Sequence, residues 1–243
     1  MTSTVETGHA KNVANFQDLI AFVNAFGAHY NPSKAALQIP QLNALHTAAE
    51  NALANVIAKN TTYNTKVNER VAAFKDVKPL ATRLVNALQS TDASSETIAD
   101  AKGFNKKLQG YRAKSIATPL DPNSPVPNTI SNSQQSYDQQ IQHLAALVAV
   151  LQNEPTYTPN EVELQTGTLT AKIADLTTKN NDVATAYANV SVSRNARNAT
   201  LYSAPDNLIE IASEVKKYVK AAFGANSPEY ANVSAIAFKK PRK

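Results

Sequence analysis

Residues 42–74 read LNALHTAAENALANVIAKNTTYNTKVNERVAAF. Its larger side chains recur at steps of three or four residues, and it contains neither Gly nor Pro. Such spacing places them on one face of an α-helix. We therefore predict one long helix over residues 41–75, about nine turns. The stripe consists of Leu42, Leu45, Ala49, Leu53, Val56, Asn60, Tyr63, Val67, Val71 and Phe74.

The same periodicity predicts the other main helices. A second long stripe, from Leu164 to Val190, predicts a helix over residues 161–198. Shorter stripes run from Phe16 to Phe26, from Leu80 to Leu88 and from Ile141 to Leu151. A last stripe runs from Leu208 to Phe223, and we expect Asp206 to cap its N-terminus and Gly224 to end it. β-Branched residues do not alternate with polar ones, so the sequence predicts an all-α protein.

A Pro-rich segment divides the sequence into two parts of similar length. Residues 115–135 contain four prolines among Asn, Ser and Thr, a composition typical of a solvated linker. We therefore expect a first helical part at residues 1–114 and a second at residues 136–243, which includes a basic C-terminal tail.

The two parts resemble each other in sequence. Tyr30-Asn-Pro32 matches Tyr157-Thr-Pro159 at an offset of 127, and Arg70 matches Arg197 at the same offset. After about seven extra residues in the second part, Phe104 matches Phe238 at an offset of 134. The ordered matches predict two tandem related helical repeats with pseudo-twofold symmetry. We expect residues 41–75 and 161–198 to be antiparallel partners in a helical bundle.

The composition excludes several kinds of chemistry. The chain has 243 residues and no Cys, which excludes disulfides, thiolate metal sites and Cys nucleophiles. No His-x-x-x-His pair and no Gly-x-Ser-x-Gly motif occur. The acidic pairs fall on predicted helix faces and form no acid–base pair. We therefore expect no catalytic residue, no metal ligand and no cofactor, and a protein that is not an enzyme.

The remaining candidates for binding are basic residues. Arg70 and Arg197 occupy matching places in the two repeats, where each is a weak candidate to contact an anion or a partner. The tail contributes Lys239, Lys240, Arg242 and Lys243, four of the charges that give the chain its net charge of +5. The body without this tail is nearly neutral, so contact with nucleic acid depends on the tail.

No feature of the sequence predicts insertion into a membrane. The N-terminal residues lack a basic region followed by an apolar one, and the longest apolar run, Leu144–Leu151, is far shorter than the ~20 residues of a spanning helix. We expect a cytoplasmic protein without integral membrane association.

Three groups of residues carry a resemblance to a known family. They are residues 8–16, residues 30–34 and the closing pattern of Phe223-Gly224, Ser227, Tyr230 and Phe238-Lys-Lys-Pro241. They resemble a family of uncharacterised, all-helical proteins of Bacteroidota. The resemblance implies a bacterial, intracellular, helical protein, and it transfers no activity and no functional residue.

These observations favour a non-enzymatic interaction or scaffold protein, which binds a protein partner or associates with itself. One alternative is a nucleic-acid-associated protein that uses the basic tail. A second alternative is a membrane-active helical protein, and an enzyme that the motifs do not mark is the third.

Overall fold

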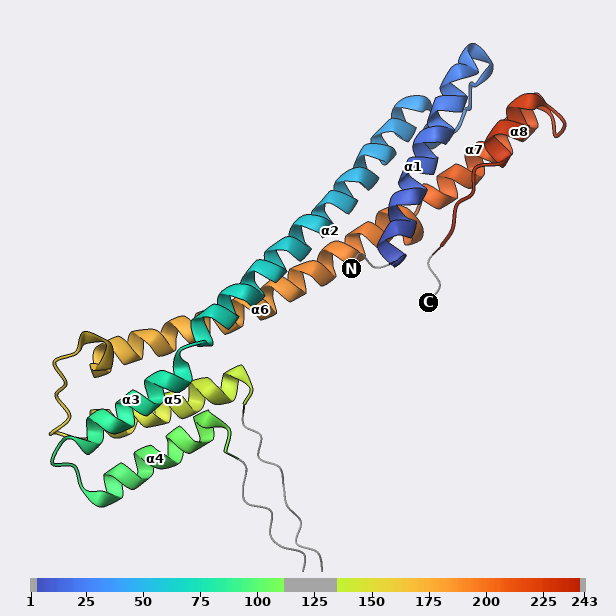
Figure 1. The fold of residues 1–243 in the computed structure, drawn as a ribbon. Helices are drawn as coiled ribbons and strands as arrows, with labels where there is room; N and C mark the ends of the chain where they lie inside the picture. Colours follow the sequence, from blue (N-terminus) through green and yellow to red (C-terminus); the bar gives the residue numbers. More distant parts are fainter. Residues whose placement is uncertain (1–3, 112–134, 241–243) are drawn as a thin grey trace, which may run out of the picture. The chain divides into compact units, whose positions relative to one another are not determined.

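The computed structural model describes residues 4–111 and 135–240, with side chains from residue 8 onward. Within these ranges the chain forms helices and no strand, so the all-α prediction is confirmed (Figure 1). The main helices are α1 (Thr4–Ala25), α2 (Ile39–Phe74), α3 (Val77–Gln89), α4 (Ser95–Gln109), α5 (Tyr137–Gln152), α6 (Thr166–Asn198), α7 (Leu208–Phe223) and α8 (Pro228–Ser234). Short 3₁₀ turns cover Gly27–His29, Ala35–Leu37 and Val162–Leu164, and a π-helical turn covers Ala199–Ser203.

The chain divides into two compact units. Unit 1 comprises Met1–Tyr63 and Ala186–Lys243, and unit 2 comprises Asn64–Thr185. Each unit thus contains helices from both halves of the sequence, because α2 and α6 each contribute to both units. This division describes packing, whereas the predicted boundaries at 1–114, 115–135 and 136–243 describe sequence copies, which stay a prediction. Nearly all of the Pro-rich segment lies outside the described residues.

The two long helices form where the periodicity predicts them. α2 spans Ile39–Phe74, and α6 begins at Thr166 instead of residue 161. The later start has a local cause, since Val162–Leu164 forms a separate 3₁₀ turn and Gln165 is extended, with ψ of 139°. Within unit 1 the two helices are antiparallel, since Asn60 contacts Arg194 and Tyr63 contacts Tyr187.

The same direction holds in unit 2. Lys66 pairs with Asp182 at 3.2 Å, and Glu69 pairs with Lys179 at 3.0 Å. Rising numbers on α2 thus accompany falling numbers on α6. The predicted antiparallel pairing of these helices is therefore found separately in each unit.

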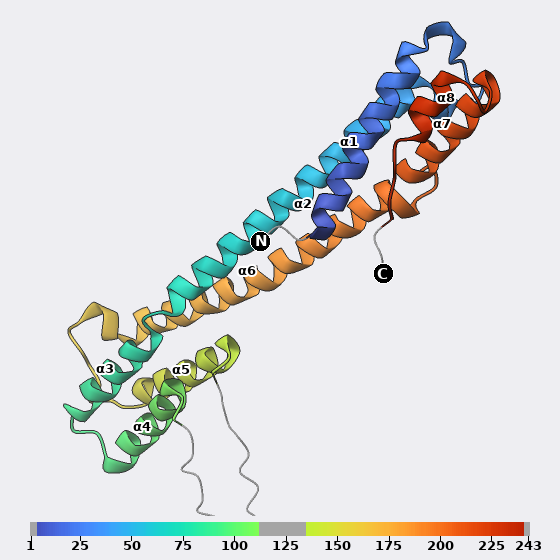
Figure 2. The ribbon, with the colours of Figure 1, turned by 45° about the vertical axis from the view of Figure 1, so that its right-hand side comes forward.

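The core of unit 1 lies where α1 and α7 meet, and α8 covers part of both helices (Figure 2). The apolar stripes of α1 and α7 supply most of its fully buried side chains, which fits their predicted amphipathic spacing. Those of α1 and α7 are Phe16, Leu19, Val23, Leu208, Ile211, Ala212, Val215 and Val219.

The core of unit 2 is built from α3, α4 and α5, which pack on one another. Leu84 and Leu88 of α3 and Leu144 and Leu147 of α5 are fully buried there. α4 ends at Gly110, whose φ is 81°. A Cβ atom at this position would lie 2.9 Å from Cδ of Gln135, so a side chain would meet both a strained backbone and a steric clash.

Two turns precede the long helices and share one hydrogen bond. The hydroxyl of Tyr30 donates to the carbonyl of Leu37 at 2.7 Å, and that of Tyr157 donates to the carbonyl of Leu164 at 3.0 Å. Both tyrosines are buried. Each tyrosine therefore anchors its turn to the residues just before a long helix.

The predicted cap of α7 is wrong by one residue. Asn207 is the N-cap, because its Oδ1 atom accepts from the backbone N–H of Glu210 at 3.1 Å. Asp206 instead takes a positive φ of 54°, a conformation in which it turns the chain before the helix. Gly224 ends α7 with a positive φ of 97°, which favours glycine.

Candidate functional site

Arg70 lies in unit 2, where it packs on an aromatic ring. Its guanidinium carbon is 4.1 Å from the centre of the Tyr137 ring, and one terminal nitrogen donates to Oδ1 of Asn180 at 3.0 Å. The Nε atom is buried without a hydrogen-bond partner. Among the described residues, no carboxylate lies within ion-pair distance of this cation. Arg70 is thus a half-buried cation held by a neutral amide and an aromatic face.

Arg197 lies in unit 1, in different surroundings. It is only 4% exposed, and its Nε and terminal nitrogen atoms donate to Oδ1 of Asn198 at 3.2 and 2.9 Å. A partner in solution cannot reach this guanidinium in the folded chain. The matched positions of Arg70 and Arg197 in the sequence therefore do not produce matched sites.

The described part of the basic tail is fixed to the body of unit 1. Residues 236–240, which we call the strap, follow α8 without forming a helix. Lys239 and Lys240 are exposed, whereas Arg242 and Lys243 lie outside the described residues. The strap therefore presents two lysine side chains to solvent from a fixed backbone.

Two asparagines of α1 hold the strap by its backbone. Asn12 donates from Nδ2 to the carbonyl of Lys239 at 2.7 Å and accepts the N–H of Lys239 at 3.1 Å. Asn15 donates to the carbonyl of Ala237 at 2.6 Å. Asn12 and Asn15 lie three residues apart and thus on one face of α1.

Asn12 also belongs to a polar cluster with His9 and Tyr202. Nδ2 of Asn12 donates to the hydroxyl of Tyr202 at 3.1 Å, and the same hydroxyl shares a hydrogen bond of 2.6 Å with Nδ1 of His9. Asn12 is 2% exposed and His9 is also buried, and each side chain forms a hydrogen bond to the Tyr202 hydroxyl. Tyr202 belongs to the π-helical turn, an irregularity that often marks functional positions.

Lys216 of α7 contacts the other side of the strap. Its ammonium donates to the carbonyl of Ile236 and, at 3.4 Å, to that of Ser234 at the end of α8. It also lies 5.2 Å from the centre of the Phe238 ring. Burial lowers the pKa of Lys216 below its ordinary value. The sequence does not point to Asn12, Asn15 or Lys216. The partners of the two asparagines are more than 200 residues away, those of Lys216 are about 20 residues away, and no motif joins any of these pairs.

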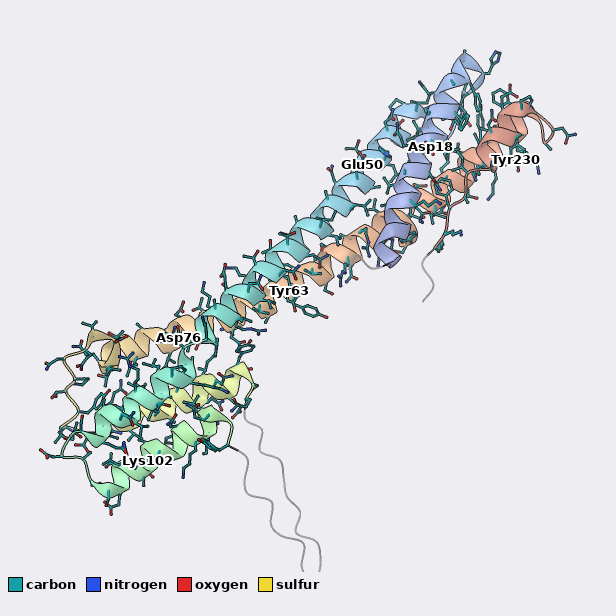
Figure 3. The ribbon with its side chains drawn as sticks, viewed as in Figure 1. Asp18, Glu50, Tyr63, Asp76, Lys102 and Tyr230 are labelled. Atoms are coloured by element: carbon teal, nitrogen blue, oxygen red, sulfur yellow. The ribbon has the colours of Figure 1, made fainter. Side chains whose placement is uncertain are left out.

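A second surface of unit 1 exposes apolar and aromatic groups on the long helices. Ile57 of α2 is 67% exposed, and Tyr187 of α6 is 61% exposed. The ring of Tyr187 lies 5.8 Å from that of Tyr63, which Figure 3 labels on α2. Arg194, two turns along α6 from Tyr187, donates to Oδ1 of Asn60 at 3.4 Å. We call Ile57, Asn60, Tyr187 and Arg194 the α2–α6 face.

Surface cavities occur at two places in the described part of unit 2. One, of about 400 Å³, lies between α3 and α6, where an ion pair of 2.6 Å joins Arg83 to Glu163. The other, of about 390 Å³, lies beside the Tyr157 turn and is lined by hydroxyl groups together with Asp92 and Glu161. Neither cavity brings a nucleophile next to a general base among its lining residues. Within the described ranges, no three His, Asp or Glu side chains gather to hold a metal ion.

The search for similar proteins found none. No protein-family model matches the chain, and neither a curated protein nor a solved structure matches it. None of the helices described is both long enough and apolar enough to cross a bilayer.

Proposed function

We propose that this chain is a non-enzymatic interaction or scaffold protein and that the α2–α6 face is its contact surface. The exposure of Ile57 and Tyr187 on rigid helices carries this proposal. Tyrosine and arginine are enriched among the residues that dominate protein interfaces, and both occur on this face. The Asn60–Arg194 hydrogen bond also keeps the arginine in place before a partner binds.

The occupant proposed for this face is a second copy of the chain. An isologous contact uses the same patch on both copies, so the apolar residue, aromatic ring and arginine of this face would meet their own equivalents on the second copy. Sedimentation velocity over a hundredfold range of concentration tests this proposal. We expect the wild type to show a monomer–dimer equilibrium and Tyr187→Ala to shift it toward monomer by at least tenfold.

A matched control is available on the same helix. Val192 is 66% exposed but lies five residues from Tyr187, on another side of α6. Val192→Ala should leave the dimerisation constant unchanged. A wild type that stays monomeric at all concentrations would contradict the proposal, as would equal effects of the two substitutions.

The pseudo-twofold duplication forms part of the proposal. The Tyr30 and Tyr157 hydrogen bonds and the 3₁₀ turns at Ala35–Leu37 and Val162–Leu164 recur at the sequence offset of 127, which supports it. We also propose a bacterial, cytoplasmic protein, on the resemblance given by the sequence.

A second candidate function is association with nucleic acid. It is favoured by the strap, which holds Lys239 and Lys240 exposed at a fixed place instead of on a loose end. Unit 1 also contains 12 of the 24 Lys and Arg residues but only 7 of the 19 Asp and Glu residues, and thus the whole net charge of +5. Fluorescence anisotropy with mixed-sequence DNA and RNA at low and physiological salt tests it. Binding that weakens with salt and is lost in a Lys239→Ala/Lys240→Ala variant would support this function.

The membrane-active alternative finds less support. The apolar stripe of α7 is buried in the core of unit 1, so this helix would have to leave the core before it could enter a lipid surface.

A further inference from the structure

The strap lies in a slot between two helices of unit 1. Asn12 and Asn15 of α1 form one wall, and Lys216 of α7 forms the other. All the hydrogen bonds from these three side chains to residues 236–240 reach backbone atoms. These hydrogen bonds therefore do not depend on which side chains the bound peptide has.

The contacts of the strap alternate along the chain. Ala237 and Lys239 bond to α1 through their backbone groups, whereas Ile236 bonds to Lys216 on the opposite side. The side chains of Ile236 and Phe238 pack against the core of unit 1, and those of Ala237 and Lys239 face solvent. This period of two is that of an extended peptide. The slot thus accepts two apolar side chains separated by one exposed residue.

The α1 wall of the slot is held in a fixed orientation. Asn12 points both of its amide atoms at Lys239, and the Tyr202 hydroxyl fixes the orientation of that amide from inside the core. A side-chain amide that is already oriented binds a backbone N–H and C=O pair at a small entropic cost. The slot should therefore keep its shape when the strap leaves.

An open groove continues the slot along α1. Its volume is about 600 Å³, and its lining includes Asn15, Asp18 and Phe22 of α1 together with Ala237 of the strap. Figure 3 labels Asp18 on α1 and Tyr230 on α8, the two helices that border this groove. A peptide longer than the strap has room to extend into it.

We infer that this slot is a peptide-binding site for an extended segment with two apolar residues at alternate positions followed by a basic residue, and that the strap of this chain is its resident ligand. Three side chains, those of Asn12, Asn15 and Lys216, bond the backbone of the strap, and Ile236 and Phe238 are only partly buried, so local release of the strap breaks fewer contacts than opening of the core helices. A peptide supplied by another molecule then occupies the same slot. The inference concerns α1 and α7 and does not depend on the α2–α6 face.

Displacement of the strap tests the inference with the full chain. Lys239→Pro removes the N–H that Asn12 accepts and so weakens the strap without changing the slot. The probe is a fluorescein-labelled peptide of residues 233–243, VSAIAFKKPRK. We expect the Lys239→Pro variant to bind it at least tenfold more tightly than the wild type, because the tethered strap competes at a millimolar effective concentration.

Two controls separate the slot from charge attraction. Adding Asn12→Ala to the Lys239→Pro chain should weaken peptide binding at least fivefold, whereas Asn43→Ala, the same substitution at an exposed position of α2, should not. A scrambled peptide of equal charge should bind no more tightly to the variant than to the wild type. A folded Lys239→Pro chain with no gain in affinity, or equal effects of the two asparagine substitutions, would overturn the inference.

Hydrogen exchange of the wild type gives a test that needs no variant. The amide of Lys239 is protected by Asn12, and an excess of unlabelled peptide 233–243 should accelerate its exchange by displacing the strap. The amides of Val215 and Val219, in the core of unit 1, serve as the internal reference. An unchanged rate at Lys239 under millimolar peptide would overturn the inference as well.

Discussion

Units 1 and 2 have turns held by the same tyrosine bond, but they differ in what surrounds it. In unit 1, the Tyr30 ring meets Tyr218 edge-on at 5.3 Å, and the Tyr218 hydroxyl accepts the N–H of Asn31. In unit 2, a cavity of about 390 Å³ lies beside Tyr157. Burial raises the pKa of both tyrosines, that of Tyr157 to about 12. The same hydrogen bond, from a tyrosine to the carbonyl seven residues later, thus occurs in two turns with different neighbours.

The two units also differ in their buried polar groups. Among the described residues, unit 1 buries His9, Asn12, Ser193, Arg197 and Asn207, whereas unit 2 buries only His143. In unit 1 part of this polarity holds the strap. In unit 2, α4 has 15 residues and packs through apolar side chains, whereas α8 of unit 1 has 7 residues and is followed by the strap.

Truncation of one large core side chain in each unit should have the largest effect. Phe16→Ala in unit 1 and Leu88→Ala in unit 2 each remove a fully buried side chain and should lower the free energy of unfolding by about 3–5 and 2–5 kcal/mol. Urea denaturation measures the loss, and hydrogen exchange shows where it falls. If the two units unfold independently, each substitution accelerates amide hydrogen exchange mainly in its own unit. Equal acceleration in both units would show that they unfold together.

Removal of each tyrosine hydroxyl compares how much the two turns contribute to stability. Tyr30→Phe and Tyr157→Phe each leave a carbonyl without its donor, that of Leu37 or Leu164, and should cost about 1–3 kcal/mol. Because Tyr157 borders a cavity that water can enter, we expect its loss to be the smaller of the two. Thermal unfolding of both variants measures this difference. A greater loss of stability from Tyr157→Phe than from Tyr30→Phe would contradict this expectation.

Acidification should act on unit 2 through its one described buried histidine. Burial, and then the charge of Lys107, lower the pKa of His143 below its ordinary value of 6.5. The unfolded chain therefore binds a proton first, and stability is lost as pH falls through 6.5. We expect the free energy of unfolding measured by urea denaturation to fall between pH 7 and pH 5 and His143→Leu to reduce that slope. A slope unchanged by the substitution would assign the pH dependence to other groups.

Reversal of the ion pairs at the two turns should have the smallest effect. Lys34 pairs with Asp206 and Glu214 in unit 1, whereas Arg83 pairs with Glu163 in unit 2. These pairs are exposed, so their contribution is small and is screened by salt. Lys34→Glu should lower the melting temperature more than Arg83→Glu, since it faces two carboxylates instead of one. The difference should vanish in 1 M NaCl, and one that persists would exclude an electrostatic cause.

The helices were predictable because each depends on local spacing. The bounds of α2 follow from the stripe between Leu42 and Phe74, and those of α7 follow within two residues from its own stripe. The errors are also local. Asp206 and Asn207 are both good caps by residue type, and the choice between them depends on which residue takes the positive φ.

The candidate site was much less predictable. Lys239 and Lys240 were identified by charge alone, but the pairing of Lys239 with Asn12 spans 227 residues. Arg197 was chosen for its match with Arg70, and the fold buried it, while Arg194 three residues earlier stayed exposed. Three residues separate the two arginines, so they lie on neighbouring parts of one helix face, and only the packing of other helices decides which of them is covered.

Apolar spacing along the sequence was enough to predict the all-α fold class and the positions of the main helices. These properties depend on the spacing of apolar residues and on turn chemistry within about ten residues, which a single sequence displays. The tertiary structure alone decided that each compact unit combines both halves of the chain and that the strap lies against Asn12, Asn15 and Lys216. The physical reason is that contacts between distant residues arise from burial of whole helix faces. No short stretch of sequence records which faces will meet.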